Sequence, residues 1–465
     1  MQTELKKKPL FSADLQQFLH QRHLLRTEIP FSEELINWHI EHGFISAEKS
    51  IIKNKKGYLC NRCGQNDKRY FSSYWSCSDE KNQMYCRSCV MMGRVSENIF
   101  LYSWIKEVEA SWQPIKLTWE GKLSLGQQKA ADILIDAITK REELLIWAVC
   151  GAGKTEILFP GIEFALNQGF RVCIATPRTD VVLELTPRLK TAFQTTKVSA
   201  LYGGSEDKGS LSPLMISTTH QLLRYKEAFD VIVIDEVDAF PYSADQTLQF
   251  AVQKARKKNS TLIYLSATPS KELKKKAHIG KLNSVRIPAR HHRKPLPEPH
   301  FCWCGNWQKK LAGSKIPKQV KIWVEQHVKE GRPVFLFVPS VSVLEKVTAC
   351  FAGMRYRTAG VHAEDKNRKE KVQQFRDGRL DVLITTTILE RGVTVPMVQT
   401  GVLGAESPIF TESALVQIAG RTGRHKKHAQ GDVIYFHFGK TKSMIDARNH
   451  INEMNKLARK NELID

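Results

Sequence analysis

Apolar and polar positions change their spacing several times along the 465-residue chain. Two stretches near the start carry apolar residues at helical spacing, 12–25 (SADLQQFLHQRHLL) and 32–44 (SEELINWHIEHGF). Each stretch opens with a serine, which suits the N-cap of a helix. Beyond them, residues 57–93 lack periodicity and are rich in cysteine, glycine and aromatic residues. The pattern predicts an N-terminal helical segment over residues 1–55 and a small module over 56–95.

Two later regions alternate short β-rich runs with amphipathic helical stretches. In residues 110–288 the strand-like runs are ELLIWAV, RVCIAT, LMISTT, DVIVIDE and TLIYLSAT. In residues 318–465 they are PVFLFVP, RTAGVHA, DVLITTT, TGVLGAE and DVIYFHF. Such alternation is typical of a parallel sheet covered by helices, so we expect two α/β lobes in tandem. Residues 289–317 between them are basic and carry four prolines, which predicts a linker.

The net charge of the chain narrows the classes of molecule that it is expected to bind. Its 70 Lys and Arg against 48 Asp and Glu give a net charge of +22. Such an excess favours a polyanion, either nucleic acid or an anionic membrane face. No run approaches the roughly 18–20 consecutive apolar residues that cross a bilayer, and the basic N-terminus lacks the apolar core of a signal peptide. We therefore expect a cytoplasmic protein, with peripheral contact at the cytoplasmic face of the membrane left open.

A phosphate-binding loop is predicted at Ala148–Thr155 (AVCGAGKT), which stands between a strand-like run and a helical stretch. Gly151 and Gly153 let backbone N–H groups converge on phosphates without a Cβ in the way. Lys154 supplies charge to the β- and γ-phosphates, and the Thr155 hydroxyl can bind Mg²⁺. The first glycine of the usual pattern is replaced here by Ala148.

A pair of carboxylates follows an apolar strand-like run at Asp235 and Glu236, in DVIVIDEVD. A buried strand of the same sheet would deliver them beside the phosphate-binding loop. Asp235 would then hold Mg²⁺, and Glu236 would orient or deprotonate the attacking water. Acidic residues after a strand can also be simple helix caps, so the motif gains its weight from the phosphate-binding loop upstream.

Five of the ten cysteines fall between Cys60 and Cys89, which fits a metal site in a reducing compartment. The pairs Cys60-x-x-Cys63 and Cys86-x-x-Cys89 are separated by 22 residues and predict a structural four-thiolate Zn²⁺ site. Cys77 between them is a possible substitute ligand, and a redox CxxC is the main alternative. The surrounding Lys, Arg, Tyr, Phe and Trp either contact single-stranded nucleic acid or build the core of the module.

In their order along the chain, these motifs resemble those of superfamily-2 helicases and translocases, of which the DEAD-box proteins are one branch. LSLGQ, ending at Gln127, resembles the adenine-sensing glutamine motif, and ATPRTDVVLEL and TTHQLL resemble the strand-contacting motifs Ia and Ic. DEVD resembles motif II, and SATP (Ser266–Pro269) resembles motif III. The stretch from Val361 to Pro396, VHAEDKNRKEKVQQFRDGRLDVLITTTILERGVTVP, resembles motifs IVa to V. The resemblance implies two tandem RecA-like, doubly wound lobes that bind and hydrolyse ATP with Mg²⁺. One departure stands out, because Thr394 stands two residues after Gly392, where many relatives have an acid.

The motif QIAGRTGR matches motif VI, and by resemblance Gln417, Arg421 and Arg424 face the γ-phosphate. Two arginines on a partner lobe can neutralise the charge that develops on the transferred phosphoryl group only when the lobes close. The residues expected to bind the nucleotide are Gln127, Gly151, Ala152, Gly153, Lys154, Thr155 and Gln417. Those expected to act in catalysis are Lys154, Asp235, Glu236, Arg421 and Arg424.

A four-cysteine module directly before such a motor resembles the ComFA-type late competence translocases of transformable Gram-positive bacteria. That resemblance implies ATP-driven movement of incoming single-stranded DNA. Its partners would be competence proteins at a membrane DNA channel. An oligomer of this chain is left open. The PriA-like replication-restart helicases share the forms of motifs Ia and VI, but carry their cysteines inside the second lobe. A non-translocating ATP-gated clamp on nucleic acid and a membrane scaffold are the further alternatives.

Overall fold

The computed structural model describes residues 11–55, 57–106, 114–207, 212–389, 395–425 and 428–464. The chain divides into two compact units. The first comprises Met1–Gly121, Ala131–Leu145 and Leu158–Leu265, and the second comprises Lys122–Ala130, Ile146–Ile157 and Ser266–Asp465. The phosphate-binding stretch therefore belongs to the same compact unit as the C-terminal part of the chain.

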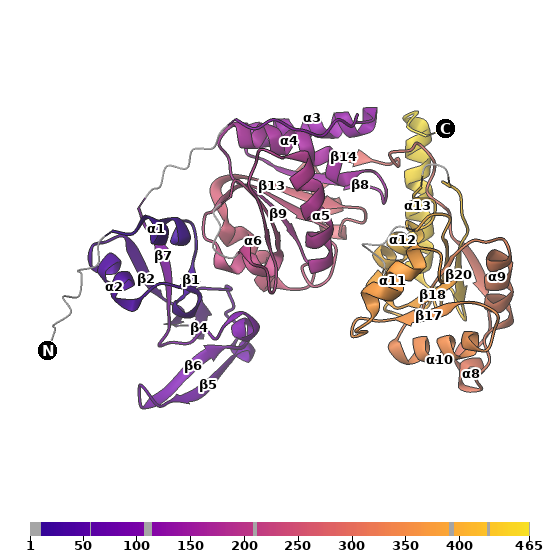
Figure 1. The fold of residues 1–465 in the computed structure, drawn as a ribbon, viewed down its shortest axis with the longest axis horizontal. Coiled ribbons are helices and arrows are strands. Elements are labelled where there is room, and N and C mark those ends of the chain that lie inside the picture. The colour runs from indigo at the N-terminus through magenta and orange to yellow at the C-terminus, as the bar shows by residue number, and fades with distance from the viewer. Residues whose placement is uncertain are drawn as a thin grey trace. The chain divides into compact units, whose positions relative to one another are not determined.

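The N-terminal part contains the two predicted helices and a small sheet (Figure 1). The helices are α1 (Ala13–Leu19) and α2 (Glu33–Glu41), and the strands are β1 (Leu24–Leu25), β2 (Ile45–Lys49) and β7 (Phe100–Trp104). Both predicted caps are confirmed, because the Ser12 and Ser32 hydroxyls accept from the backbone N–H of Leu15 and Leu35. The antiparallel sheet, in the order β1-β7-β2, was not predicted. Its central strand comes from a distant part of the chain, so local periodicity does not indicate it.

Two hairpins place the cysteines. The hairpins are β3 (Ile51–Asn54) with β4 (Gly57–Cys60), and β5 (Phe71–Ser76) with β6 (Lys81–Cys86). Cys60 and Cys86 are the last residues of β4 and β6, so each CxxC begins where the second strand of a hairpin ends. The second CxxC continues into the 3₁₀ helix η3 (Arg87–Met92).

The first α/β region forms a seven-stranded sheet in the order β10-β11-β9-β12-β13-β8-β14. Its strands are β8 (Glu143–Ala148), β9 (Val172–Thr176), β10 (Val198–Leu201), β11 (Leu214–Thr218), β12 (Phe229–Asp235), β13 (Arg256–Ser266) and β14 (Asn283–Ile287). Its helices are α3 (Leu125–Lys140), α4 (Lys154–Asn167), α5 (Thr179–Ala192), α6 (Gln246–Ala255) and α7 (Lys271–His278), with the 3₁₀ helix η5 (Thr219–Arg224). The pairs from β10 to β13 are parallel. All five predicted strands are confirmed, whereas the edge strands β10 and β14 were missed.

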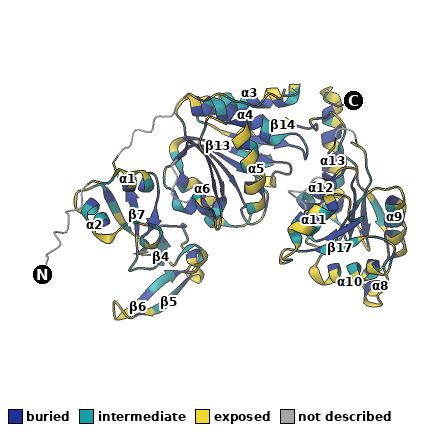
Figure 2. Ribbon diagram, in the orientation of Figure 1, coloured by how far each residue is buried: buried dark blue, intermediate teal, exposed yellow. Residues whose placement is uncertain are grey.

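Burial distinguishes the central strands from the edge strand β14, although not from β10, whose four residues are all buried. Every residue of β9 and β11 is buried, as expected for strands covered by helices on both faces (Figure 2). The edge strand β14 alternates exposed polar and buried apolar residues over only five positions. A short mixed pattern of this kind is hard to distinguish from a loop.

The second α/β region forms a six-stranded sheet in the order β15-β20-β19-β16-β18-β17. Its strands are β15 (His300–Trp303), β16 (Val334–Phe337), β17 (Thr358–Val361), β18 (Val382–Thr385), β19 (Gln399–Leu403) and β20 (Val433–His437). Its helices are α8 (Trp307–Ala312), α9 (Lys318–Lys329), α10 (Val341–Ala352), α11 (Arg368–Arg376), α12 (Glu412–Ala419) and α13 (Lys442–Lys460). Every neighbouring pair of strands is parallel. The predicted fold class, two parallel α/β lobes after a cysteine module, is confirmed.

Part of the range predicted as linker belongs to this second lobe. Strand β15 pairs with β20, and Cys304, Trp307 and Leu311 lie in the hydrophobic core beneath the sheet. The prolines and basic residues of 289–299 precede this strand. The predicted linker is therefore too long. The four-residue strand β15 and the six-residue helix α8 are too short to show a periodic pattern, so composition alone marked their residues as linker.

Candidate nucleotide site and cysteine cluster

The phosphate-binding loop has the predicted strand–loop–helix form. β8 ends at Ala148, and α4 begins at Lys154. Gly151 and Gly153 have φ of +83° and +74°, a backbone conformation that a residue with a Cβ rarely adopts. The backbone N–H groups at the start of a fourteen-residue helix and the positive end of its dipole favour an anion there. The loop is thus shaped for phosphate.

Gln127, on the first turn of α3, lies against this loop. Its Nε2 donates to the carbonyl of Ala152 at 2.8 Å, and its Oε1 accepts from the backbone N–H of Ser124 at 2.8 Å. A Cβ at Gly153 would lie 2.4 Å from Gln127 Nε2, so the close approach depends on a glycine. The structure therefore brings the predicted glutamine to the phosphate-binding loop.

The motif VI segment also contacts this loop, within the same compact unit. Helix α12 ends at Ala419, and a Cβ on the next residue, Gly420, would lie 2.5 Å from the Cβ of Cys150. Arg421 is buried, with 2% of its surface exposed, and Arg424 Nε donates to the carbonyl of Gly420 at 2.9 Å. The glycine permits the close approach of the motif VI segment, which carries both arginines, to the Cys150 side chain.

Asp235 is the last residue of β12, and Glu236 follows it with φ of +61°. Left-handed backbone at a residue other than glycine is uncommon and is often found at functional sites. β12 and β8 belong to one sheet, with β13 between them. β13 ends at Ser266, the first residue of the predicted motif III. The hydroxyl oxygen of Thr268 in motif III lies 2.7 Å from that of Ser413 in α12, so motif III contacts α12.

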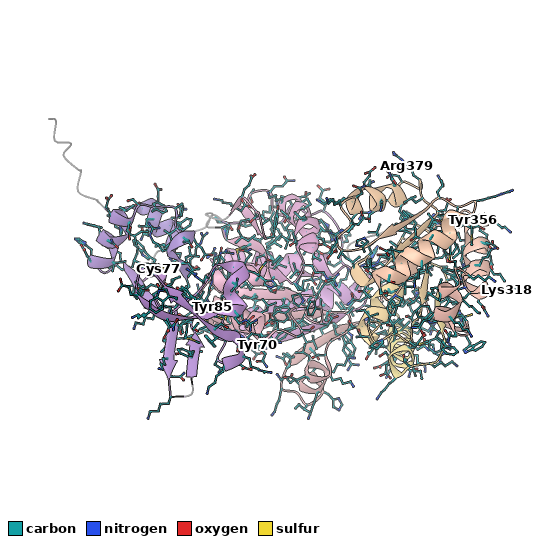
Figure 3. All side chains as sticks on the ribbon, turned by 90° about the horizontal axis from the view of Figure 1, so that it is seen from below. Tyr70, Cys77, Tyr85, Lys318, Tyr356 and Arg379 are labelled. Atoms are coloured by element: carbon teal, nitrogen blue, oxygen red, sulfur yellow. The ribbon has the colours of Figure 1, made fainter. Side chains whose placement is uncertain are left out.

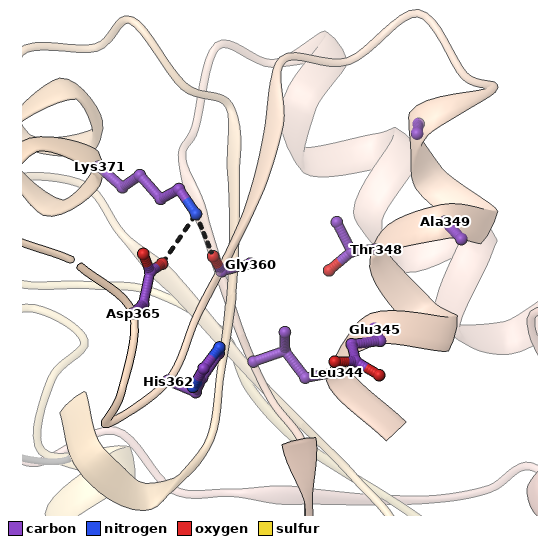
Figure 4. A pocket seen from close by; sticks show the side chains of 9 residues that line it. Leu344, Glu345, Thr348, Ala349, Gly360, His362, Asp365 and Lys371 are labelled. Atoms are coloured by element: carbon purple, nitrogen blue, oxygen red, sulfur yellow. Dashed lines mark hydrogen bonds and ion pairs between the residues drawn. The ribbon is translucent and has the colours of Figure 1, made fainter. Parts of the chain in front are cut away.

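The motif V departure, Gly392 and Thr394, lies outside the described residues. Elsewhere among the described residues, the second lobe holds a cavity of about 470 Å³ between α10, β17 and α11 (Figure 4). Lys371 Nζ donates to the carbonyl of Gly360 at 3.1 Å and pairs with Asp365 at 2.8 Å. The Lys371 hydrogen bond lowers the pKa of Asp365. The pair fixes the turn after β17, where the motif IVa stretch begins.

The four predicted cysteines form one cluster. Cys60, Cys63, Cys86 and Cys89 are buried, and their sulfurs all lie within 4.8 Å of one another. The Cys60–Cys89 and Cys63–Cys86 sulfurs are 3.8 and 3.6 Å apart. Four sulfurs about 2.3 Å from a tetrahedral zinc ion would be about 3.8 Å apart. The cluster therefore suggests zinc. Cys77, which is labelled in Figure 3, is exposed in the turn after β5 and is not one of the four clustered cysteines.

The pKa shifts of the clustered thiols also favour a bound cation. Hydrogen bonds from Cys60 and Cys63 lower the pKa of Cys86, whereas hydrogen bonds from its three neighbours raise the pKa of Cys89. Opposite shifts are expected when crowded thiols share protons, because four adjacent thiolates repel one another. A divalent metal would remove this conflict.

A buried network connects the first CxxC to the first α/β lobe, inside one compact unit. Arg62, between the two cysteines of the knuckle, is fully buried and donates to Glu28 at 2.8 Å. Glu28 also accepts from Arg224, the last residue of η5, at 2.7 Å. Lys254 of α6 donates to the carbonyls of Arg62 and Leu223, at 2.9 and 2.6 Å, and its burial lowers its pKa to about 7.

Sequence reasoning missed this network. The residues Glu28, Arg62 and Lys254 are single charged positions in regions where most charges are solvated, and no motif marks them. Arg62 alone carried a signal, because it lies between the two cysteines of a predicted metal knuckle. The network ties the cysteine cluster to η5, which overlaps the predicted strand-contacting motif Ic.

The aromatic residues of the module divide between its core and its surface. Phe71 is buried and its ring contacts that of Tyr58. Trp75 and Tyr70 are exposed, with 60% and 44% of their surfaces accessible. Phe71 and Tyr58 therefore belong to the core of the module, whereas Trp75 and Tyr70 lie on its surface.

Two parallel α/β lobes with a phosphate-binding loop and an arginine-bearing motif VI define a helicase-like ATPase of superfamily 2. The helicase conserved C-terminal domain matches residues 315–426, and the type III restriction enzyme res subunit matches residues 120–271. RecG bound to a three-way DNA junction aligns with a TM-score of 0.52 and 17% identity, over 75% of this chain and 49% of that one. S. cerevisiae Dbp5 bound to RNA and ADP BeF3 aligns with a TM-score of 0.51 and 16% identity, over 71% of this chain and 91% of that one. These structures support the fold.

The N-terminal region identifies the family. The competence protein ComFA N-terminal domain matches residues 6–103. The chain is 76% identical to competence protein ComFA of Bacillus subtilis (strain 168) over 465 residues, the whole of both chains. It is 38% identical over 376 residues to competence protein ComFA of Streptococcus pneumoniae (strain ATCC BAA-255 / R6), covering 80% of this chain and 86% of that one. The chain belongs to the ComFA family of competence proteins.

The family decides between the two resemblances that the motifs left open, in favour of ComFA over PriA-like helicases. The chain is a helicase-like ATPase involved in DNA uptake during transformation. Its helicase domains imply ATP hydrolysis and nucleic-acid binding. Among the described residues, no helix is long and apolar enough to span a membrane.

Proposed function

We propose that the chain uses the hydrolysis of MgATP, stimulated by single-stranded DNA, to move along the incoming strand and draw it into the cytoplasm. The observation that carries this proposal is the phosphate-binding loop, which Gln127 and Gly420 contact from α3 and from the end of α12. A nucleotide bound there would be sensed by both elements. Binding and release of nucleotide would then change how the motif VI arginines are held, which is the cycle that a motor requires.

Each predicted site residue takes a role in this proposal. Lys154 would neutralise the β- and γ-phosphates, and the backbone of Gly151, Ala152 and Gly153 would cradle them. Thr155 and Asp235 would hold Mg²⁺, Glu236 would orient the attacking water, and Gln127 would read the adenine. Gln417, Arg421 and Arg424 would act on the γ-phosphate and stabilise the charge that develops on it.

Single-stranded DNA is the proposed substrate because stacking platforms and positive charge occur together. Trp75 and Tyr70 are exposed on the cysteine module, and Lys68, Arg69 and Lys81 lie near them in the sequence. Exposed aromatic faces stack on unpaired bases while cations meet phosphates. The net charge of +22 supplies the long-range attraction.

We further propose that Cys60, Cys63, Cys86 and Cys89 hold one structural Zn²⁺. All four positions of a tetrahedral site would be filled by protein, so the metal would stabilise the fold and leave no place for a reactive water. The chain would work at the cytoplasmic face of the membrane, with competence proteins of the DNA channel as partners. Self-association into an oligomer remains compatible with this arrangement.

One experiment tests the proposal and its alternatives. The ATPase rate is measured for the full-length protein with single-stranded DNA, duplex DNA and RNA side by side, at several salt concentrations. We expect the largest stimulation with single-stranded DNA, and a steep loss of binding as salt rises. Equal rates with and without nucleic acid would support a scaffold instead. Stimulation without directional displacement of a protein bound to the strand would support a clamp.

A further inference from the structure

Three consecutive residues in the range predicted as linker, Arg290, His291 and His292, contact both loops of the candidate nucleotide site. The three residues, the phosphate-binding loop and the motif VI loop all belong to one compact unit. The backbone N–H and the Nδ1 of His291 both donate to the carbonyl of Gly151, at 3.1 and 2.9 Å. His292 Nε2 donates to the carbonyl of Gly423 at 3.1 Å. The segment thus connects the two loops by hydrogen bonds.

Arg290 makes the strongest of these contacts. Its side chain is buried, with 2% of its surface exposed. Nη1 donates to the carbonyl of Gly423 at 2.6 Å, and Nη2 donates to the carbonyl of Thr422 at 2.8 Å. These two carbonyls lie between Arg421 and Arg424 in the chain. A guanidinium fork on both carbonyls therefore fixes the backbone that carries the two predicted γ-phosphate arginines.

The charge of Arg290 has no protein counter-ion in the parts of the chain that the structure describes. Its partners are neutral carbonyls, and its buried Nε has no hydrogen-bond partner. Burial and the neighbouring Arg424 lower its pKa to about 10, so it stays charged at neutral pH. A Cβ at Gly151 would lie 3.5 Å from Arg290 Cγ, which places the side chain beside the phosphate-binding loop.

A buried, uncompensated guanidinium is costly unless an anion approaches it. The feature of this neighbourhood that is shaped for an anion is the phosphate-binding loop itself. We propose that Arg290 is a positioning residue of the ATPase, which couples the polyphosphate of a bound nucleotide to the placement of Arg421 and Arg424. The inference rests on the proposed function and adds a residue that lies outside the helicase motifs named in this sequence.

A simpler role has to be distinguished from this one. Cations near the C-terminal end of a helix stabilise its free carbonyls, and Thr422 and Gly423 follow α12 closely. An arginine with that role alone would stabilise the fold whether or not a nucleotide is bound. A positioning residue would instead matter most in the transition state, when the arginines act.

The test compares variants of the full-length protein in MgATP with saturating single-stranded DNA. In Arg290→Gln, we expect kcat to fall by about tenfold or more while KM changes by less than about threefold, because the motif VI arginines lose their support. Binding of ADP with aluminium fluoride, which mimics the transition state, should weaken by about tenfold or more while ADP affinity is retained. Arg290→Lys keeps the charge but loses the fork, so we expect intermediate values.

The matched control is Arg293→Gln, which alters an exposed arginine of the same segment that donates to the carbonyl of Glu462. We expect wild-type kinetics from it. In the double variant Arg290→Gln with Arg421→Ala, kcat should equal that of Arg421→Ala alone, because both changes remove one function.

Two results would overturn the inference while leaving the proposed function intact. One is an Arg290→Gln protein with the kinetics of Arg293→Gln. The other is an Arg290→Gln protein in which ADP and the transition-state mimic weaken equally and the double variant is additive. If Arg290→Gln does not fold, the same criteria apply to Arg290→Lys. A wild-type protein no faster than Lys154→Ala would overturn the proposed function, and the inference with it.

Discussion

Replacing Glu28 by glutamine should loosen the cysteine module from the first α/β lobe. Glu28 accepts from the fully buried Arg62 of the first CxxC and from Arg224 at the end of η5. It also accepts from the backbone N–H of Leu25, at 2.9 Å. The side chain of Glu28 is only 14% exposed, so these charged hydrogen bonds are largely shielded from water. Glutamine has nearly the same size, so the substitution removes the charge with little change in packing.

The expected loss follows from the burial of the pair. Removing one partner of a buried ion pair typically costs about 3–5 kcal/mol, because the remaining charge is left without compensation. The amide oxygen of glutamine still accepts one neutral hydrogen bond of about 1 kcal/mol, which leaves a net loss of about 2–4 kcal/mol. For a small domain that loses about 1–2 kcal/mol of stability per molar urea, the unfolding midpoint should fall by at least about 1 M.

Zinc release during urea unfolding reports on the module alone and can be followed with a coloured chelator. Asp67→Asn is the matched control, because Asp67 pairs with Arg69 in the same module at the surface, where Arg69 is 84% exposed. Asparagine can keep the cap that Asp67 provides for the next turn. We expect the control to unfold like the wild type and Glu28→Gln to release zinc at lower urea. Coincident curves for all three proteins would refute the buried-network reasoning.

Three further predictions concern catalysis and the metal. Glu236→Gln should still bind ATP but hydrolyse it about a hundredfold more slowly, which is the usual scale for losing a general base. Lys154→Ala should lose ATP binding and hydrolysis together. Wild-type turnover by Glu236→Gln would contradict the assignment of Glu236. Arg421→Ala should lower kcat strongly with the nucleotide still bound, because its charge acts on the transition state, and a collapse of affinity at unchanged kcat would argue against this role. Replacing Cys60 and Cys63 together by alanine should release one Zn²⁺ per chain by elemental analysis and lower DNA-stimulated ATPase; a wild-type protein purified without chelator and free of metal would end the zinc proposal.

The sequence predicts the elements whose signal is local. Strands β9, β11 and β12 contain unbroken apolar runs because helices cover both faces of their sheet, so they stand out against the amphipathic segments between them. The phosphate-binding loop combines glycines, a lysine and a threonine in eight residues, and the cysteine pairs have fixed spacing. Each of these features is set by chemistry that a few adjacent residues must satisfy, and so it can be recognised without a structure.

The residues that the sequence does not predict have their partners far along the chain. Glu28 and Arg224 are 196 residues apart, and Arg290 and Gly423 are 133 residues apart. A single arginine in a basic segment has the same local pattern whether it is solvated or buried on a carbonyl. Only the fold shows whether such an arginine is solvated or buried. For that reason the sequence predicts Arg290 as part of a linker.

The contact between Glu28 and Arg224 connects a family-specific segment to a motif that superfamily-2 proteins share. The ComFA N-terminal domain, residues 6–103, provides Arg62 and Glu28. Glu28 pairs with Arg62 and also with Arg224, which follows the motif Ic stretch. Because Lys254 binds the carbonyls of both Arg62 and Leu223, a shift of the knuckle would be felt directly at η5. A module that only gripped DNA would need no buried charge against the lobe, since a flexible tether would serve. The cost of burying Arg62 and Lys254 therefore argues that the module sets the geometry of the first lobe where the resemblance places contact with the strand.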